Sequence, residues 1–277
     1  MARTRFTHGP ELPAVRSGTA LVTGASSGIG WATAEKLRDA GFTVYGTSRR
    51  GADAPHPEGI TMVPLVGDDL ESVREAVEAT GPVDVLVANH GESQSGAFEE
   101  LPPDALERVF RVNVLSQVQL AQLVLPGMRA SGRGRIVFVG SMLGSMPLPY
   151  RSSYVATKAA VSGFGQSLRG EVAQFGIGVS VVEPGSINTG ISQRRTKYGE
   201  DGPYGQDMST MISRLDANEA KGITADQVAD VIVEEILADR PKAYRARGSF
   251  ARVVGPLRRI LPVQGTLDLM KRFHGLR

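Results

Sequence analysis

"VTGASSGIGWATAEKL", residues 22–37, joins a short β-branched run to a stretch with helical spacing. Gly24 permits a tight turn, Gly28 permits the backbone to approach a phosphate, and Gly30 permits a helix to pack closely on a strand. A strand that enters a helix through such a turn can bind a pyrophosphate at the helix N-terminus, although a plain strand-to-helix turn uses the same glycines without a ligand. The stretch therefore predicts a βα unit with a candidate phosphate site.

The remainder of the chain continues this alternation of strands and helices. Apolar runs predict strands at 19–22, 42–47, 60–65, 83–88, 135–139, 179–182 and 242–245, and amphipathic spacing predicts helices at 29–40, 69–80, 103–131, 153–175 and 224–238. Continuous apolar strands that alternate with helices are typical of a parallel sheet covered on both faces. We expect one α/β domain over 17–277, a doubly wound parallel sheet of about seven strands.

Three segments fall outside this pattern. Residues 1–16 lack the apolar segment of a signal peptide and are expected to form a flexible tail. Residues 190–223 are rich in glycine and have little periodicity, which favours a mobile cover over a site. Residues 250–277 are expected to form a helical extension, and the chain from Arg240 onward carries ten lysines and arginines against one acid, Asp268.

The composition excludes several classes of protein. A chain of 277 residues with 41% hydrophobic content can bury a full core. The absence of cysteine excludes disulfides and thiolate metal sites, and the four histidines have no ligand spacing, so no metal is expected. No run of about 18 apolar residues could span a bilayer, and no basic run is interleaved with stacking aromatics. We expect a cytoplasmic protein that binds no nucleic acid.

Polar motifs follow the later strands, at the edge where a doubly wound sheet forms its ligand crevice. They are "VANHG" at 87–91, Ser141 after the run 135–139, and "VEPGSINTG" at 182–190. Tyr154 lies thirteen residues after Ser141, and Lys158 lies one helical turn after Tyr154. Such a Tyr and Lys are usually only a surface pair, so their meaning depends on the motifs around them.

In this order and spacing the motifs resemble the classical short-chain dehydrogenase/reductases, densely over 17–184. The resemblance implies a single-domain Rossmann fold, a nicotinamide cofactor, interconversion of a carbonyl and an alcohol, and a homodimer or homotetramer. It also implies a catalytic set of Asn113, Ser141, Tyr154 and Lys158. The tail "VVGPLRRILPVQGTLDLMKRF", 253–273, is similar to the extensions of steroid- and retinol-dehydrogenase-like members.

The chemistry explains why the reaction needs these residue types. A free tyrosine titrates at about 10, too high for a base at neutral pH. The positive charge of Lys158 one turn away favours the phenolate. Ser141 donates a hydrogen bond to the substrate oxygen, and Asn113, by the resemblance, supports a water that links the lysine to solvent. Because "GSMLG" is not Gly-x-Ser-x-Gly, a hydrolase nucleophile is not indicated.

The resemblance also assigns the cofactor contacts, with two departures from the family pattern. His90 stands where a small residue is expected, and we favour space filling over a polar contact to the cofactor. Val66 stands where an Asp usually contacts the adenine, so Asp68 either takes that contact or caps the following helix. The full set is Gly24, Ser26, Ser27, Gly28, Ile29, Gly30, Ser48, Arg49, Arg50, Asp68, Asp69, Asn89, His90, Gly91, Tyr154, Lys158, Pro184, Gly185, Ile187 and Thr189.

"VYGTSRR", 44–50, indicates which nicotinamide cofactor is used. An acid at this strand end accepts the ribose 2′-OH of NAD and repels the 2′-phosphate of NADP. Here Thr47 and Ser48 precede Arg49 and Arg50, and no acid is present. A guanidinium donates paired hydrogen bonds to a phosphate. The sequence predicts NADP(H), although a solvated arginine pair would look the same.

The residues between Ser141 and Tyr154 predict the substrate. Met142, Leu143, Met146, Leu148 and Tyr150 would give the pocket an apolar wall. We expect a small hydrophobic ketone or aldehyde and its alcohol. An NAD-linked alcohol dehydrogenase, a 3-oxoacyl reductase and a non-catalytic nucleotide-sensing or scaffold protein are the alternatives. The basic tail is expected to cover the pocket or a subunit interface rather than a membrane surface.

Overall fold

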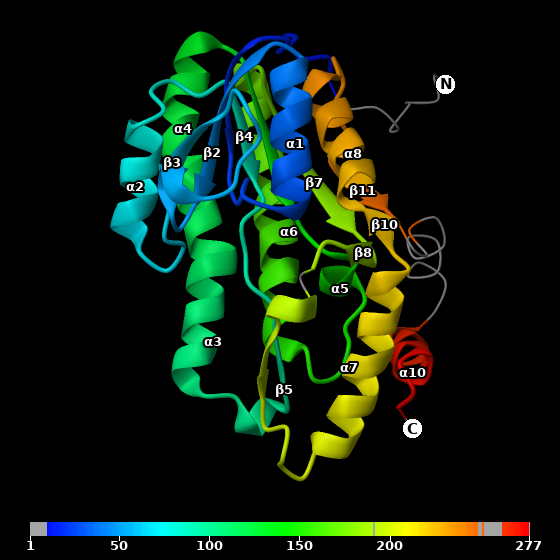
Figure 1. Ribbon diagram of the computed structural model, residues 1–277. Helices are drawn as coiled ribbons and strands as arrows, with labels where there is room; N and C mark the ends of the chain where they lie inside the picture. Colours follow the sequence, from blue (N-terminus) through cyan, green and yellow to red (C-terminus); the bar gives the residue numbers. More distant parts are fainter. Residues whose placement is uncertain (1–9, 191, 249–250, 252–261, 277) are drawn as a thin grey trace, which may run out of the picture.

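A parallel sheet forms the centre of the molecule in the computed structural model, which describes residues 10–190, 192–248, 251 and 262–276 (Figure 1). Its seven strands run in the order β11-β7-β6-β4-β1-β2-β3. They are β1 (Gly18–Val22), β2 (Phe42–Ser48), β3 (Thr61–Pro64), β4 (Val85–Ala88), β6 (Gly134–Val139), β7 (Ile177–Pro184) and β11 (Tyr244–Arg247). Every neighbouring pair is parallel. The predicted α/β fold is confirmed.

Helices cover both faces of this sheet because the strands are apolar on both sides. On one face, α1 (Gly28–Asp39) packs beside α8 (Ala225–Leu237) over a core that includes Val22 and Val85. On the other face lie α2 (Leu70–Glu78), α4 (Ser116–Ser131) and α6 (Ser152–Val172). The arrangement is the expected doubly wound sheet.

The order of the strands places a crevice at the centre of the sheet. From β1 the chain moves outward through β2 and β3 and then returns to β4 on the other side of β1, where Ala20 pairs with Val85. At such a reversal the loops that follow the two strands diverge and leave room for a ligand. Thr23 and Asn89 therefore stand at the crevice, one after each strand.

The long helix predicted at 103–131 is interrupted in the structure. It consists of α3 (Pro103–Phe110), a π-helical turn at Arg111–Leu115, and α4. In this turn the Ser116 N–H donates to the carbonyl oxygen of Arg111, five residues back. The extra residue rotates the helix, and Asn113 is fully buried. Such turns interrupt the regular hydrogen bonds and are frequent at functional sites.

The segment 190–223, expected to have little regular structure, contains the helix α7 (Gly205–Ala220). Met208, Met211, Ile212 and Leu215 are buried along one face of it. Their spacing of three and four residues is typical of an amphipathic helix, so the sequence did contain the signal. Two short parallel pairs bracket α7: β8 (Ile187–Asn188) with β10 (Ile223–Thr224), and β5 (Gln94–Gly96) with β9 (Thr196–Tyr198).

The expectation of a flexible tail over 1–16 is wrong for residues 10–16, and residues 1–9 lie outside the described residues. Val15 is fully buried in the core beside α1 and α8. The Leu12 N–H donates to the carbonyl oxygen of Asp239 at 2.8 Å, and Arg135 donates to the carbonyl oxygen of Pro13 at 2.9 Å. The apolar side chains and the backbone hydrogen bonds fix this segment to the domain.

Candidate active site

Two adjoining hollows lie at the carboxyl edge of the sheet. A polar cleft of about 670 Å³ runs along the glycine-rich turn, and an apolar pocket of about 270 Å³ contains Ser141, Tyr154 and Lys158. Asn89 and Thr189 line both hollows. The two hollows are therefore contiguous at these residues.

The glycine-rich turn forms an open cradle at the start of α1. Gly24 has a φ of 69°, and a Cβ on Gly30 would lie 2.3 Å from the carbonyl oxygen of Gly24. Ser27 stands at the N-cap with no side-chain capping bond, and no acid lies in the first turn. The first N–H groups of α1 thus face the cleft without a side-chain acceptor, a geometry that fits a phosphate.

Thr23 ties the ends of β1 and β4 together behind this cradle. Its Oγ1 accepts the Asn89 N–H at 2.9 Å and lies 2.9 Å from Nδ1 of His90. The other ring nitrogen of His90 lies 2.7 Å from Oγ of Ser116. Burial, together with the charge of Lys158, lowers the pKa of His90 to about 4. A neutral His90 therefore fills the wall of the cleft and is bound by protein groups.

The end of β2 contributes a positive charge to the cleft. Ser48 and Arg49 line the cleft, and the ion pairs among the described residues do not include Arg49. Arg50, assigned a cofactor contact from the sequence, does not line the cleft. The side chain of Arg50 is exposed. Its backbone N–H donates to Oγ of Ser48 at 3.1 Å in the turn that follows β2. One arginine of the pair thus faces the cleft.

The two aspartates assigned to the cofactor lie apart. Asp68 lines the cleft and pairs with Arg108 at 3.5 Å. Asp69 lies outside the cleft lining and caps α2, because its Oδ1 accepts the Glu71 N–H at 2.9 Å. Of the two roles that the sequence left open for Asp68, the helix cap is taken by Asp69.

Tyr154 and Lys158 lie one turn apart on the face of α6 that meets the sheet, and both are almost fully buried. The Lys158 Nζ donates to the carbonyl oxygen of Val139 at 2.9 Å and lies 5.9 Å from the centre of the Tyr154 ring. Burial lowers the pKa of Lys158 to about 8, and the charge of Glu183 opposes that shift. The ammonium form still predominates at neutral pH.

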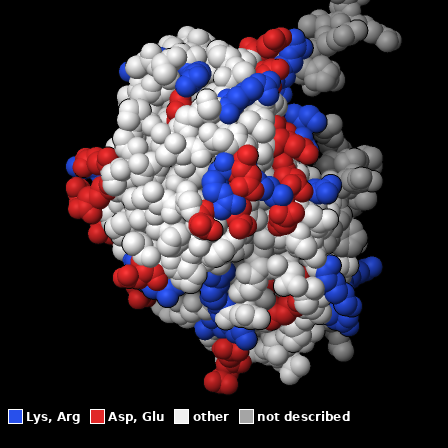
Figure 2. Space-filling view, turned by 45° about the horizontal axis from the view of Figure 1, so that its top comes forward, with Lys and Arg blue, Asp and Glu red and all other residues white. Residues whose placement is uncertain are grey.

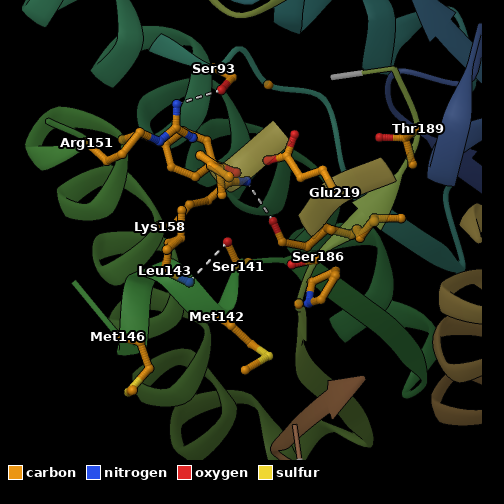
Figure 3. A pocket seen from close by; sticks show the side chains of 18 of the residues that line it. Ser93, Ser141, Met142, Leu143, Met146, Arg151, Lys158, Ser186, Thr189 and Glu219 are labelled. Atoms are coloured by element: carbon orange, nitrogen blue, oxygen red, sulfur yellow. Dashed lines mark hydrogen bonds between the residues drawn. The ribbon is translucent and has the colours of Figure 1, made fainter. Parts of the chain in front are cut away.

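Ser141 and Asn113 complete the set expected from the sequence. Ser141 caps the short helix α5 (Met142–Ser145), where its Oγ accepts the Leu143 N–H at 3.2 Å (Figure 3). The Ser141 side chain also lowers the pKa of Tyr154. Asn113 accepts the Glu92 N–H at 2.8 Å and donates to the Glu92 carbonyl oxygen at 3.0 Å. The structure brings Ser141, Tyr154 and Lys158 together, and Asn113 fixes the backbone beside them.

Arg151 is a site residue that the sequence reasoning missed. Its guanidinium lies 4.3 Å from the centre of the Tyr154 ring, and its Nη1 donates to Oγ of Ser93, the carbonyl oxygen of Gln94 and Oγ of Ser95. Burial lowers the pKa of Arg151 to about 10, so it is charged at neutral pH. No sequence signal separates this arginine from an exposed one, since the partners on β5 become neighbours only through the fold.

Opposing effects act on the pKa of Tyr154. Burial raises the pKa of Tyr154, the charge of Arg151 and the hydrogen bond with Ser141 lower it, and the carboxylate of Glu219 raises it. The positive groups therefore offset part of the cost of forming a buried phenolate.

The pocket wall is apolar, and the C-terminal helix contributes to it. Met142, Leu143 and Met146 line the pocket, as do residues of α10 (Val263–Phe273) and the residue after it: Leu269, Met270, Phe273 and His274. Pro184, Gly185 and Ile187, assigned to the cofactor from the sequence, line this pocket too. The part of the extension at 252–261 lies outside the described residues.

Two residues assigned to the substrate wall lie elsewhere. Leu148 is buried against α7, beside Met211 and Leu215. Tyr150, with a φ of 62°, packs against Tyr204, with the ring centroids 6.4 Å apart and the rings tilted by 56°. The chain turns away from the pocket after Met146, so both side chains anchor α7 instead of lining the pocket.

Over the described ranges, no group of histidine and acidic side chains could hold a metal ion. The helices in the same ranges include none with the length and apolar character needed to cross a bilayer.

Comparisons with known proteins agree with this geometry. A family model described as short chain dehydrogenase matches residues 18–199. A 3-ketodihydrosphingosine reductase of Bacteroides thetaiotaomicron is 34% identical over 251 residues, which cover 87% of this chain and 89% of that protein. An NADPH-dependent 3-dehydrocapnine reductase of Ornithobacterium rhinotracheale is 31% identical, with coverage of 81% and 86%. A crystal structure of a short-chain dehydrogenase from Streptomyces avermitilis superposes with a TM-score of 0.77 at 30% identity, covering 92% of this chain and 96% of that one. The chain belongs to the short-chain dehydrogenase/reductase family of oxidoreductases.

Proposed function

We propose that the chain is an NADP(H)-dependent oxidoreductase that reduces a hydrophobic ketone or aldehyde to its alcohol. One observation carries the proposal: Ser141, Tyr154 and Lys158 stand in an apolar pocket that adjoins a cleft lined by Arg49. The cleft fits a phosphate-bearing cofactor, and the pocket fits an apolar body with one polar group.

The side chains of the pocket supply the proton that carbonyl reduction requires. The reduced nicotinamide, when bound, supplies a hydride to the carbonyl carbon. Tyr154 donates its hydroxyl proton to the carbonyl oxygen, so the C=O double bond becomes a C–O–H group. Ser141 donates a hydrogen bond to the same oxygen, and the charges of Lys158 and Arg151 stabilise the phenolate that remains.

Arg49 supports NADP(H) as the cofactor. Its guanidinium lines the cleft without an acidic partner among the described residues, and no acid stands at the end of β2 to bind a ribose 2′-OH. The 3-dehydrocapnine reductase relative is named as NADPH-dependent. Because cells generally keep the NADP pool reduced, carbonyl reduction is the proposed direction.

Arg49→Ala tests this assignment. We expect it to weaken NADPH binding by about 1.5–3 kcal/mol, the range for a hydrogen bond to a charged group, with little effect on NADH. Arg50→Ala is the matched control, since the neighbouring arginine does not line the cleft. Calorimetric titration of each variant with both cofactors measures the effect. An equal loss of NADH affinity in Arg49→Ala would show that the arginine does not read the 2′-phosphate.

The apolar wall and two relatives support a hydrophobic ketone as substrate. Met142, Leu143 and Met146 line the pocket together with Leu269 and Met270 of α10, and Met270 packs against Met142 and Met146. The relatives named above are reductases of 3-ketodihydrosphingosine and 3-dehydrocapnine. We infer that the substrate presents its carbonyl to Tyr154 and its apolar body to the methionines and α10.

Arg151→Met tests the role given to the buried arginine. Burial raises the pKa of Tyr154, and the charge of Arg151 opposes this effect. Without that charge the pKa of Tyr154 should rise. The alcohol oxidation that needs the phenolate should therefore shift to higher pH, and Arg151→Lys should restore part of the shift. Profiles of kcat/KM against pH for alcohol oxidation measure the shift. The midpoint of such a profile does not depend on the fraction of protein that is active. An unchanged profile in Arg151→Met would contradict the role.

We also propose that two copies of the chain pair through α4 and α6. Leu115 at the start of α4 is 46% exposed and Phe164 on α6 is 48% exposed. Large apolar side chains on long helices are typical of surfaces that a second subunit covers.

A further inference from the structure

Arg194 is a cation at the cofactor cleft that the proposed reaction does not use. It lies at the end of the short helical turn Ser192–Arg194, and it lines the cleft. Its Nη1 donates to Oγ of Ser27 at 3.1 Å. Because Ser27 is the N-cap of α1, this guanidinium lies at the helix end where the cleft fits a phosphate.

A second contact holds the same connection against the glycine-rich turn. Thr189, five residues before Arg194, packs on Gly28, since a Cβ on this glycine would lie 3.3 Å from the Cβ of Thr189. Thr189 and Arg194 both line the cleft. The N–H groups at the start of α1 and the guanidinium of Arg194 therefore border the same part of the cleft.

Arg195, the next residue in the chain, anchors the backbone beside Arg194. Its side chain is buried and pairs with Glu219 at 2.8 Å and with Asp216. Both acids belong to α7, so these ion pairs tie the connection to that helix. The two successive arginines therefore have separate roles: Arg195 fixes the backbone, and Arg194 reaches the cleft.

The charge of Arg194 is not balanced by an acid. On the face that Figure 2 shows, basic and acidic side chains lie intermixed. Within the cleft, Arg108 follows this pattern, because it pairs with Asp68 at 3.5 Å and with Glu92 at 3.2 Å. The ion pairs in the described part of the chain do not include Arg194, and the Ser27 hydroxyl accepts its hydrogen bond without balancing its charge. An anion is therefore the ligand that this guanidinium fits.

We propose that Arg194 binds the pyrophosphate of the cofactor and so completes the cradle at the start of α1. The proposal rests on the nicotinamide cofactor proposed above. The exposed guanidinium can leave the Ser27 hydroxyl without breaking an ion pair, and a phosphate can then accept two parallel charge-assisted hydrogen bonds from it. Arg49 lies at the end of β2 and is assigned the 2′-phosphate, so the two arginines recognise different phosphate groups.

Titration with both cofactors tests the proposal, because the pyrophosphate is common to NADPH and NADH. We expect Arg194→Ala to raise the dissociation constant of each cofactor by about tenfold or more, since a hydrogen bond between charged groups is lost. Calorimetry without any substrate measures both constants. Unchanged affinities would overturn the assignment, and so would a loss confined to NADPH, which would assign Arg194 to the 2′-phosphate.

Two further variants separate the pyrophosphate contact from other roles of the charge. Arg194→Gln keeps an N–H donor but loses the charge, so it should lose as much affinity as Arg194→Ala. Affinity restored by glutamine would mean that a hydrogen bond of this side chain only holds the connection in place, and would overturn the proposal. Lys197→Ala is the matched control, because Lys197 lies outside the cleft lining and pairs with Glu200 at 3.6 Å. An equal loss in Lys197→Ala would show only a general attraction of the cofactor, and would also overturn it.

Adenosine 2′-monophosphate provides a ligand that has the 2′-phosphate but no pyrophosphate. Arg194→Ala should bind it as tightly as the unmutated protein does, whereas Arg49→Ala should bind it less tightly. A weaker affinity in Arg194→Ala would show that the variant distorts the cleft, and would overturn the assignment.

These binding measurements also separate the proposal from the proposed reaction. If NADH binds as tightly as NADPH, or if no ketone is reduced, the proposed function is contradicted. A tenfold loss of both cofactors in Arg194→Ala would still support the pyrophosphate contact in that case.

Discussion

Tyr154→Phe is expected to lower kcat by about 10²–10⁴-fold, the typical contribution of a positioned general acid, while NADPH affinity stays close to that of the unmutated protein. The substitution deletes one hydroxyl, and the aromatic ring that stacks against Arg151 remains. The buried shape of the site is therefore preserved, and the lost function is the proton donor. Steady-state reduction of an apolar ketone, together with calorimetric titration of NADPH, measures the two quantities separately.

Tyr150→Phe is the matched control for this experiment. Tyr150 lies four residues earlier and packs against Tyr204, outside the pocket lining. Its hydroxyl should be dispensable for turnover. If Tyr154→Phe kept a large share of kcat, or if Tyr150→Phe lost as much activity, the assignment of the proton donor to Tyr154 would be wrong.

Lys158→Met is expected to damage both turnover and cofactor affinity. The ammonium lies 5.9 Å from the Tyr154 ring and favours the phenolate, and we also assign it a contact to the nicotinamide ribose. Exposed Lys221 is outside the site, so Lys221→Met is the control. Titration with NADPH and the rate of ketone reduction measure the two losses. An unchanged NADPH affinity in Lys158→Met would contradict the assigned contact between Lys158 and the nicotinamide ribose.

The same lysine sets an expected pH dependence. Burial lowers the pKa of Lys158 to about 8, so its positive charge is present below that pH and is lost above it. The rate of ketone reduction should fall as the pH rises through this value, because the phenolate then loses its support. A profile of kcat against pH should show this fall in the unmutated protein and lack it in Lys158→Met.

The central strands of the sheet could be predicted because each is a local apolar run. The runs at 19–22 and 135–139 correspond to β1 and β6, and parallel order follows from their alternation with helices. The interruption at Arg111–Leu115 could not be predicted, because a π-helical turn has the same residue types as an α-helix. Residues 10–16 have neither strand nor helix periodicity in the sequence, but burial of Val15 fixes them.

Some residues of the candidate site could be predicted from the sequence and others could not. Ser141, Tyr154 and Lys158 could be located because the motifs around them resemble those of the short-chain dehydrogenase/reductases, and all three line one pocket. Arg151 and Glu219 could not be located from the sequence. Arg151 contacts β5 and Glu219 contacts Arg195, and these contacts arise only when the chain is folded. Residues that act through tertiary contacts leave no local pattern in the sequence.

The central claim is that this pocket performs ketone reduction with NADPH. The most direct test compares kcat/KM for NADPH and NADH in the unmutated protein, with an apolar ketone as the second substrate. We predict turnover of the ketone and a value for NADPH at least about tenfold higher, since one charge-assisted contact to the 2′-phosphate accounts for that ratio. Equal values, a higher value for NADH, or turnover restricted to small, highly charged substrates would contradict the account.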